Sequence, residues 1–581
     1  MRKTKIICTL GPATDKDNVL EELILNGMNV ARVNFSHGSH EEHLVRVNAV
    51  KKLRDKHRLP VAILLDTKGP EIRTCVMPEG GVMLNAGTTV TLTTKDVKGS
   101  DTVIPISYPD LPKDLGDKKT ILIDDGRVEL RVLKIMKDAI ECEVLNSGIV
   151  SSKKGVNVPG AKLNLPAISE KDKADILFGI ENDFDFIAAS FVRNGEDVIA
   201  LRNLLDNNNG SSIGIISKIE NSEGVENIDT ILHLSDGVMV ARGDLGVEVS
   251  YEQVPQIQKM IIAKAISLSK PAIIATQMLE SMISNPRPTR AEVSDVANAI
   301  YDLTTAVMLS GETAAGKYPV ECLKVMSKTA EATEGNINYR KRYFTGGFKE
   351  TNDITNAVTN AAVTTAYNLN ADAIIVVTKS GRTAFSIAKY RPAINIIATT
   401  PEKKSFHQIG LAWGVYPIHA EEKGTFDDLF HSAMDHSKES GLVKDGDLAV
   451  ITAGVPVGRS GMTNVMRIET VGDVITRGKK LVEGKAYGKA CVCRTEKEGF
   501  EKFSDNDVLI IASTDNSILP LMKRASAIIL QEDDINDHAK TVGMAIDIPV
   551  ISNAHGVISM IKDGTMLEVD GNTGVIQIAR K

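Results

Sequence analysis

Residues 213–220 read Ile-Gly-Ile-Ile-Ser-Lys-Ile-Glu, and residues 237–244 read Gly-Val-Met-Val-Ala-Arg-Gly-Asp. Each stretch is a short apolar run that ends at charged side chains, Lys218 and Glu220 in the first and Asp244 in the second. Short apolar runs separated by helical stretches are typical of strands buried on both faces of a parallel sheet. The two stretches therefore predict neighbouring parallel strands with charged residues at their carboxyl ends.

Six further runs in the first two-thirds of the chain repeat this pattern of apolar residues followed by polar groups. Eight such runs indicate an α/β fold of the (β/α)8 TIM-barrel type, in which the active site lies at the carboxyl ends of the strands. The polar groups occupy those ends. The eight runs are Ile6–Leu10, Val30–Val33, Ala62–Leu65, Phe186–Ala189, Ile213–Ser217, Gly237–Val240, Ala272–Ala275 and Ala306–Leu309.

Composition and periodicity divide the rest of the chain. After the third run the helical rhythm disappears, and short β-branched runs alternate with Gly, Asp and Pro turns. We expect a catalytic barrel of residues 1–69 and 165–338, with residues 70–164 as an inserted β-barrel lid domain at its mouth. A new alternation of strands and helices predicts a C-terminal α/β domain over residues 339–475. Residues 484–581 are expected to form an extra small C-terminal domain.

The overall composition argues against several classes of protein. A net charge of −7 over 581 residues gives no basic surface for nucleic acid. No apolar stretch approaches the roughly 20 residues that cross a membrane, and the basic start of the chain lacks the apolar core of a signal peptide. Six scattered cysteines predict buried, reduced thiols in a cytoplasmic protein, with a metal role for Cys491 and Cys493 as the alternative.

Several charged residues near the strand ends suit phosphoryl chemistry. Lys218 and Glu220 project from the same face of a strand, and with Asp244 they bring together the two carboxylates that typically hold Mg²⁺. A structural salt bridge would explain the lysine and glutamate alone. Arg32 and Arg73 lie at the ends of the second and third strands, and a guanidinium matches phosphate bidentately. The combination favours phosphoryl transfer, in which fixed cations stabilise the moving charge.

A second group of oxygen ligands lies at the ends of the second and third strands. Asn34, Ser36, Asp66 and Thr67 carry one charge among them, which suits a monovalent cation better than a divalent one. Alternatively, Asn34 and Ser36 cap the helix that begins near Ser39. The spacing alone leaves both interpretations open.

Six segments at these strand ends closely resemble the signatures of pyruvate kinases. The resemblance runs from Arg2 to about Asp473 and implies transfer of the phosphoryl group of phosphoenolpyruvate to ADP, which gives pyruvate and ATP in glycolysis. It also implies a barrel, a β lid and a C-terminal regulatory domain. The segments are Ala31–Gly38, Asp66–Thr74, Ile216–Asn221, Val240–Gly246, Ala275–Met282 and Met308–Ala314.

Carried over position by position, the resemblance implies that Glu220 and Asp244 hold Mg²⁺ (or Mn²⁺). Lys218 and Arg73 would stabilise the transferring phosphoryl group, and Arg32 would contribute to binding of the substrate phosphate and the nucleotide. The backbone amides of Gly243 and Asp244 and the Thr276 hydroxyl would position the substrate carboxylate, and Thr276, Ser310 and Glu312 would lie on the proton route.

The resemblance further implies a K⁺ ion, and the glutamate at position 71 implies that activity depends on it. The potassium ligands would be Asn34, Ser36, Asp66 and the Thr67 carbonyl, and the nucleotide would be bound by Asn34, His37, Arg73 and Lys154.

A phosphate pocket is predicted where a strand meets a helix at residues 378–383, because hydroxyl groups, a glycine and backbone N–H groups converge there. An ordinary turn is the alternative. The resemblance implies a sugar-phosphate or nucleotide effector at this turn, beside the loop 454–461, and assembly as a homotetramer. The effector residues would be Thr378, Lys379, Ser380, Gly381, Arg382 and Thr383.

The tail from about Gly484 resembles the extra domain of some bacterial pyruvate kinases, which is similar to the phosphohistidine domain of phosphoenolpyruvate-using enzymes. Asp537 stands beside His538 in place of a hydroxyl residue and would repel a phosphoryl group, so a structural role is expected. Two rival functions are a barrel aldolase with Lys218 as the Schiff-base nucleophile, and a metabolite sensor without catalysis.

Overall fold

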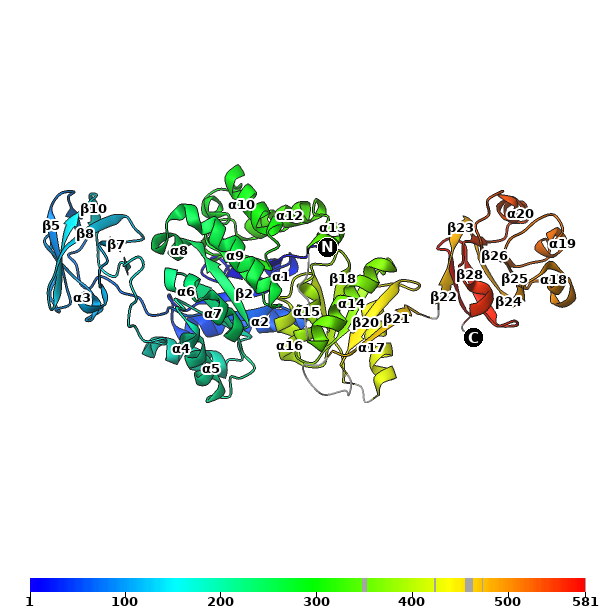
Figure 1. Ribbon diagram of the computed structural model, residues 1–581, viewed down its shortest axis with the longest axis horizontal. Coiled ribbons are helices and arrows are strands. Elements are labelled where there is room, and N and C mark those ends of the chain that lie inside the picture. Colours follow the sequence, from blue (N-terminus) through cyan, green and yellow to red (C-terminus); the bar gives the residue numbers. More distant parts are fainter. Residues whose placement is uncertain (347–352, 423–424, 455–462, 473, 580–581) are drawn as a thin grey trace. The chain divides into compact units, whose positions relative to one another are not determined.

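The computed structural model describes residues 1–346, 353–422, 425–454, 463–472 and 474–579 (Figure 1). The chain forms two compact units. The first comprises Met1–Asn356 and Thr378–Glu421, and the second comprises Ala357–Val377 and Glu422–Lys581. Within the described ranges, no helix has both the length and the apolar composition needed to span a membrane.

The first unit contains a closed barrel of eight parallel strands, so the predicted fold class is confirmed. The strands follow one another round the barrel in chain order, and the last pairs with the first. They are β1 (Lys5–Thr9), β2 (Val30–Asn34), β3 (Ala62–Asp66), β12 (Phe186–Ala189), β13 (Gly214–Ile219), β14 (Gly237–Ala241), β15 (Ala272–Ala275) and β16 (Ala306–Leu309).

Helices alternate with these strands, and their starts follow local capping chemistry. Ser169 caps α4 in a capping box, because its hydroxyl accepts from the Asp172 amide at 3.1 Å while the Asp172 carboxylate accepts from the Ser169 amide. The helices are α1 (Val19–Leu25), α2 (His40–His57), α4 (Glu170–Glu181), α5 (Gly195–Asp206), α7 (Ile228–Leu234), α9 (Val254–Ser267), α10 (Arg290–Tyr301) and α12 (Pro319–Gly335). Further short helices are α6 (Ser222–Glu226), α8 (Arg242–Glu248), η1 (Tyr251–Gln253), η2 (Glu280–Ile283) and α11 (Gly311–Ala314).

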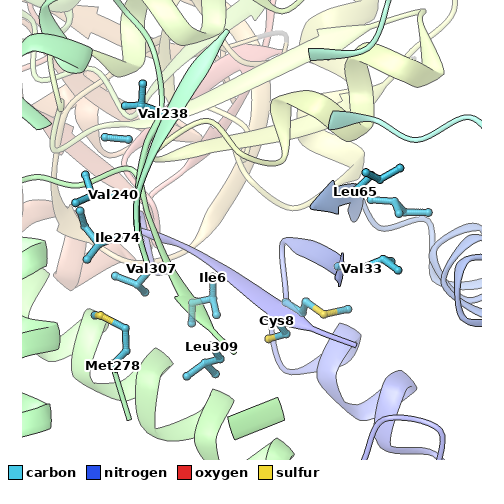
Figure 2. Packing of buried hydrophobic residues seen from close by; sticks show 14 of the residues in the cluster. Ile6, Cys8, Val33, Leu65, Val238, Val240, Ile274, Met278, Val307 and Leu309 are labelled. Atoms are coloured by element: carbon cyan, nitrogen blue, oxygen red, sulfur yellow. The ribbon is translucent and has the colours of Figure 1, made fainter. Parts of the chain in front are cut away.

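Strand alternation separates the barrel core into two layers. Ile6 on β1 packs outward with Val307, Ile274 and Val240 from β16, β15 and β14, in a cluster between the sheet and its helices (Figure 2). Ile7 points the other way and joins the cluster inside the barrel. Both layers are fully buried, so the strands form a rigid support for the side chains at their ends.

The inserted β domain lies in the sequence between β3 and α4. Its strands form a six-stranded sheet in the order β11-β7-β8-β9-β5-β6 and a two-stranded sheet of β10 and β4, around an apolar core of their own. The elements are β4 (Val82–Leu84), β5 (Thr89–Thr93), β6 (Val103–Pro105), α3 (Leu111–Asp114), β7 (Thr120–Ile123), β8 (Val128–Ile135), β9 (Ala139–Val144), β10 (Gly148–Val150) and β11 (Val156–Asn157).

The first unit also includes a segment that packs against the amino-terminal end of the barrel. Gln408 donates to the carbonyl oxygens of Asp185 and Ser212 at 2.9 and 2.8 Å, and Leu411 joins the inner apolar cluster. The elements of this part are α13 (Tyr339–Thr345), α15 (Arg382–Ala388), β18 (Asn395–Thr400), α16 (Lys403–Ile409) and β19 (Val415–His419).

In the second unit, β17 (Ala373–Val377) pairs in parallel with β20 (Leu448–Ala453), and β20 pairs in antiparallel with β21 (Val465–Thr470). Helices α14 (Ile354–Asn368) and α17 (Phe426–Glu439) accompany these strands in the sequence.

A separate eight-stranded sheet with the order β22-β29-β28-β24-β25-β26-β27-β23 follows. Its elements are β22 (Val474–Arg477), β23 (Lys479–Val482), β24 (Lys485–Cys493), α18 (Glu496–Lys502), β25 (Val508–Ile511), α19 (Leu519–Met522), β26 (Ala527–Leu530), α20 (His538–Ile546), β27 (Val550–Ser552), α21 (Val557–Met560), β28 (Met566–Asp570) and β29 (Val575–Ile578).

Cys491 and Cys493 point to the same side of β24, and their sulfur atoms lie 3.6 Å apart in an apolar cluster. Burial raises the pKa of the Cys491 thiol to about 12, which keeps it protonated. Across the described residues, no group of three or more His, Cys, Asp and Glu side chains is arranged to hold a metal ion. Both thiols are free and buried, as the sequence predicts for them.

Lys5, the first residue of β1, is a buried cation at the amino-terminal end of the barrel. Its Nζ donates a 2.7 Å hydrogen bond to the Val415 carbonyl oxygen. Burial, together with repulsion from Arg2 and Lys3, lowers the pKa of Lys5 to about 7, although Glu334 opposes this shift.

Replacing Lys5 with methionine is expected to remove a pH-dependent part of the stability. The ordinary pKa of lysine is 10.5, so between about pH 7 and 10.5 the unfolded chain binds more protons than the folded one. The free energy of unfolding of the unmodified chain should therefore rise, relative to that of Lys5→Met, as the pH increases through this window. Thermal melting of both proteins between about pH 7 and 10.5 measures the difference. A gap in melting temperature that stays constant over this pH range would contradict the lowered pKa of Lys5.

Candidate active site

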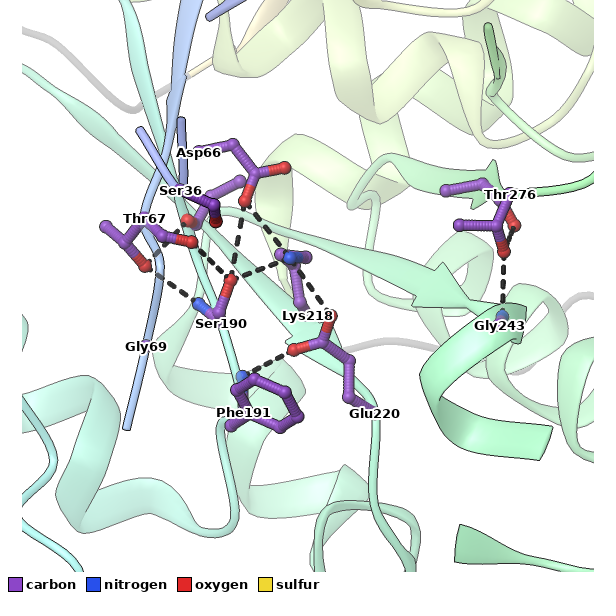
Figure 3. A network of polar contacts seen from close by, with 12 residues as sticks. Ser36, Asp66, Thr67, Gly69, Ser190, Phe191, Lys218, Glu220, Gly243 and Thr276 are labelled. Atoms are coloured by element: carbon purple, nitrogen blue, oxygen red, sulfur yellow. Dashed lines mark hydrogen bonds and ion pairs between the residues drawn. The ribbon is translucent and has the colours of Figure 1, made fainter. Parts of the chain in front are cut away.

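Lys218 lies at the centre of a buried polar network at the carboxyl ends of the barrel strands (Figure 3). Its Nζ is 3.0 Å from Asp66 Oδ1, 3.0 Å from Glu220 Oε1 and 2.6 Å from Ser190 Oγ. Strand β13 extends through Ile219, two residues beyond the apolar run in the sequence, so Lys218 is held by the sheet itself. The ammonium group is thus fixed by three partners from three strands or strand ends.

The pKa values of the groups in this network depend on burial and on the neighbouring charges. Burial alone would lower the pKa of Lys218, but Asp66 and Glu220 outweigh it, so the pKa lies above its usual range and the lysine stays charged. For Asp66, burial is outweighed by Arg32 and Lys218, and the pKa is lowered. Burial dominates at the other two carboxyls, raising the pKa of Glu220 to about 7 and that of Asp244 above its ordinary value.

Arg32 joins the network from β2. Its Nε donates to Asp66 Oδ2 at 2.6 Å, and its Nη1 donates to Thr9 Oγ1 at 2.9 Å. Arg32 is 8% exposed, so it is almost completely buried at this edge of the barrel. Asp66 thereby joins Arg32 and Lys218 through its two carboxylate oxygens.

Glu220 offers an oxygen that suits a metal ion. Its Oε2 accepts the Phe191 backbone N–H at 2.6 Å, whereas its buried Oε1 has no hydrogen-bond partner among the described residues, although Lys218 lies near it as an ion pair. Asp244 follows the neighbouring strand β14. Two carboxylates at adjacent strand ends, one of which has a buried oxygen held only by the Lys218 ion pair, fit Mg²⁺, which takes few protein ligands and completes its shell with water and substrate oxygens.

The end of β15 is bonded to the start of α8. Thr276 Oγ1 accepts the Gly243 N–H at 2.8 Å and donates to the Ala275 carbonyl at 2.6 Å (Figure 3). Thr276 and Gln277 have φ values of 68° and 55°, which are unfavourable for residues with a side chain, above all for β-branched threonine. The fold thus maintains backbone strain where this hydroxyl faces the start of α8.

The donors predicted to bind a monovalent cation lie at the paired ends of β2 and β3, where Asn34 is in register with Asp66. Helix α2 begins at His40 and is capped by Ser39, so the alternative in which Asn34 and Ser36 cap that helix is wrong. Asn34 Oδ1 instead accepts the Ser36 N–H at 3.1 Å. Amide, hydroxyl and carbonyl oxygens with one carboxylate are a donor set that fits K⁺.

A cavity of about 340 Å³ opens between the strand ends and the inserted β domain, and Asp244, Arg73 and Lys154 are among the residues that line it. Arg73 is held by the Glu71 carboxylate and the Lys153 carbonyl, and Lys154 pairs with Asp124 at 2.9 Å. These contacts hold both cations within the inserted β domain, where they line the same cavity as Asp244. His37 is exposed.

Ser310 follows β16, and its backbone N–H donates to Glu312 Oε2 at 2.7 Å. The other oxygen of Glu312 accepts the Leu279 N–H at 3.0 Å, and the carboxylate is buried. Glu312 thus connects the loops after β15 and β16, which carry Thr276 and Ser310.

The predicted effector residues lie outside this site, in the turn that leads into α15. The Gly381 N–H donates to Thr378 Oγ1 at 3.0 Å, and Thr400 Oγ1 donates to the Lys379 carbonyl at 3.2 Å. Gly381 has a φ of 78°, which only glycine adopts without strain. Of the loop 454–461, which the resemblance associates with the effector, residues 455–461 lie outside the described residues. Thr378, Gly381 and Thr383 are buried, whereas Lys379, Ser380 and Arg382 are exposed.

His538 begins α20 in the second unit, and its Nδ1 lies 3.0 Å from Thr514 Oγ1. The carboxylate of Asp534 accepts from the Ala539 and Lys540 amides at 3.3 and 2.9 Å, so an acidic side chain already occupies this helix start. A second anion at this position would meet electrostatic repulsion.

One residue of the network was not assigned from the sequence. Ser190 follows β12, and its hydroxyl contacts both Lys218 and the Thr67 carbonyl. Its position directly after the fourth apolar run was the available signal, but a lone serine at a strand end indicates no particular partner.

Three family models match successive parts of the chain. Residues 1–323 match "Pyruvate kinase, barrel domain", residues 356–469 match "Pyruvate kinase, alpha/beta domain" and residues 503–574 match "PEP-utilising enzyme, mobile domain". The last match agrees with the resemblance noted for the tail.

Relatives and a solved structure agree with these models. The chain is 48% identical to a pyruvate kinase of Geobacillus stearothermophilus over 577 residues, covering 99% of this chain and 98% of the relative. It is 46% identical to one of Staphylococcus haemolyticus, with 99% of each covered. A crystal structure of a pyruvate kinase from Cryptosporidium parvum superimposes with a TM-score of 0.78 at 42% identity, covering 81% of this chain and 96% of that one. This chain belongs to the pyruvate kinase family, because its barrel and its α/β domain both match the family models and its relatives match it over their full length.

Proposed function

We propose that the buried network at the barrel rim transfers the phosphoryl group of phosphoenolpyruvate to ADP, with Lys218 and Arg32 as the fixed cations. The observation that carries this assignment is the Lys218 ammonium held 3.0 Å from both Asp66 and Glu220. Its raised pKa keeps the charge that a transferring phosphoryl group needs. The same charge disfavours the aldolase alternative, which requires a neutral amine.

Glu220 and Asp244 would hold Mg²⁺ or Mn²⁺, which supplies charge neutralisation at the substrate oxygens when bound. The Gly243 and Asp244 amides and the Thr276 hydroxyl would then orient the substrate carboxylate. Thr276 and Ser310, whose loops are joined through Glu312, would guide the proton that converts the enolate to pyruvate. Asn34, His37, Arg73 and Lys154 would bind the nucleotide, with Arg73 reaching the phosphoryl group from the inserted β domain.

Replacing K⁺ with tetramethylammonium at constant ionic strength is expected to abolish most of the activity. Asn34, Ser36, Asp66 and the Thr67 carbonyl would bind a small monovalent cation, and an organic ion of this size cannot enter such a donor set. Initial rates of pyruvate formation, with Na⁺ as a second comparison, measure the effect. Equal turnover in K⁺ and tetramethylammonium would refute the potassium site.

We further propose that the turn at residues 378–383 binds a phosphorylated activator. Its support is the convergence of hydroxyl groups and a positive-φ glycine at the start of α15. Replacing Thr378, Ser380 and Thr383 together with alanine should remove activation by sugar phosphates or nucleotides and leave the basal rate largely intact. Rates measured at low phosphoenolpyruvate across an activator titration test this, because reciprocal linkage raises substrate affinity. Activation that survives the triple substitution would place the effector elsewhere.

A further inference from the structure

Ser190 forms a second connection between the predicted K⁺ site and Lys218, besides the direct contact of Lys218 with Asp66 at 3.0 Å. Its hydroxyl accepts a 2.6 Å hydrogen bond from Lys218 Nζ and donates one of 2.6 Å to the Thr67 carbonyl oxygen (Figure 3). A hydroxyl has a single proton, so with Lys218 as the donor the Ser190 proton points away from the lysine. The Thr67 oxygen receives it at a shorter distance than Asp66 Oδ1, which lies 3.4 Å away. The hydrogen bonds therefore run in one direction, from Lys218 through Ser190 to Thr67.

The backbone fixes the two ends of this connection. The Ser190 N–H donates to Thr67 Oγ1 at 3.1 Å, and the Thr67 N–H donates to the Ala188 carbonyl at 3.0 Å, which continues the pairing of β3 with β12. Gly69 has a φ of 76°, and a Cβ at this position would come within 2.7 Å of the Ser190 Cβ. The chain after Thr67 thus passes directly over Ser190, which is 6% exposed. Thr67 and Ser190 are held as one unit.

The connection matters because Thr67 and Lys218 belong to different functions in the proposed mechanism. A carbonyl oxygen has two lone pairs, so Thr67 can accept from Ser190 and still face a cation. Lys218 has two other partners, Asp66 and Glu220, and both are carboxylates. Ser190 is its only neutral partner among the contacts of the described residues, and without it the ammonium would be drawn toward those charges.

We propose that Ser190 is a positioning residue that couples the monovalent-cation site to Lys218, so that K⁺ at Thr67 and the placement of the Lys218 ammonium depend on each other. This inference rests on the proposed assignment of the Thr67 carbonyl to the K⁺ site. It goes beyond that assignment by naming a neutral group, besides the Asp66 carboxylate, through which K⁺ acts on the phosphoryl-transfer lysine.

The test compares Ser190→Ala with a matched control, Ser217→Ala. Ser217 is also buried, but its hydroxyl pairs with Ser235 at 2.6 Å, away from Lys218. Two quantities are measured. The first is kcat as a function of K⁺ concentration at saturating phosphoenolpyruvate, and the second is the rise in melting temperature that K⁺ causes in the substrate-free protein. Tetramethylammonium chloride keeps the ionic strength constant in both.

In Ser190→Ala, kcat should fall by about 10- to 100-fold, because a displacement of a catalytic group by about 1 Å can have an effect of this size. The KM for phosphoenolpyruvate should change much less. The activation of kcat by K⁺ should shrink, and the K⁺ concentration needed for a given rise in melting temperature should increase about tenfold. Ser217→Ala should match the unmodified enzyme in both K⁺ responses.

Ser190→Cys provides a second variant if the alanine variant folds poorly, since the thiol keeps most of the volume but is a weak donor and acceptor. It should shift both K⁺ responses in the same direction. If both K⁺ responses stay unchanged in Ser190→Ala and Ser190→Cys, with or without a loss of kcat, the coupling is overturned and the cation site is not affected. An unmodified enzyme that responds to K⁺ in neither readout would overturn the cation site itself and the coupling with it.

Discussion

Lys218→Met is expected to lower kcat by about a thousandfold while changing the KM for phosphoenolpyruvate much less. Removing one preorganised charge or donor from the position where charge develops typically costs about 10²–10³ in kcat, and Lys218 is the central cation of the network. Methionine keeps much of the side-chain volume but cannot pair with Asp66 or Glu220. The loss should therefore appear in the chemical step rather than in substrate binding.

Lys404→Met is the matched control. Lys404 is also a largely buried lysine of the first unit, but its Nζ contacts Asp183 and the Phe184 carbonyl at the amino-terminal end of the barrel. This variant should retain kcat within a small factor even if its melting temperature falls. Steady-state rates of pyruvate formation and melting curves for both variants separate catalysis from folding. A Lys218→Met enzyme with nearly full kcat would remove the lysine from the mechanism.

Glu220→Gln is expected to lower kcat/KM by about 10²-fold or more and to weaken binding of the divalent cation. The change keeps the shape of the side chain and removes one of the two carboxylates proposed to hold Mg²⁺, whose stabilisation of transition-state charge amounts to several powers of ten in rate. The amide also places a neutral group beside Lys218, which then pairs with Asp66 alone.

Binding of Mn²⁺ followed by electron paramagnetic resonance measures the metal directly, apart from turnover. Glu292→Gln is the control, because that carboxylate caps α10 through Thr289 and contacts Ser281 instead of the site. Glu292→Gln should bind Mn²⁺ as the unmodified enzyme does, and Glu220→Gln should bind it much more weakly. Equal Mn²⁺ binding by all three proteins would show that Glu220 is not a ligand.

Much of the fold was predictable because buried parallel strands leave a simple signal. The runs at residues 186–189, 272–275 and 306–309 coincide with β12, β15 and β16, since all of their residues are apolar and both of their faces are covered. The ends of the strands were less certain. Lys218 lies inside β13 rather than after it, because its charge is satisfied within the barrel by Asp66 and Glu220.

The site was predictable in its residues but not in its contacts. The spacing of Lys218 and Glu220 predicted that both side chains lie on one face of a strand. The pairing of Arg32 with Asp66 and Thr9 could not be predicted, because it depends on three strands that meet at one edge of the barrel. The role of Ser190 depends in the same way on two long-range contacts. Local chemistry also decided one ambiguity, because Ser39 occupies the cap of α2 that Asn34 and Ser36 could have taken.

The most direct test follows phosphoenolpyruvate, pyruvate, ATP and inorganic phosphate together by phosphorus NMR and a pyruvate assay, with and without ADP. Direct transfer between the two substrates at this rim predicts pyruvate and ATP in equal amounts, and almost no pyruvate when ADP is left out. Pyruvate released with inorganic phosphate at a similar rate in the absence of ADP would contradict the account.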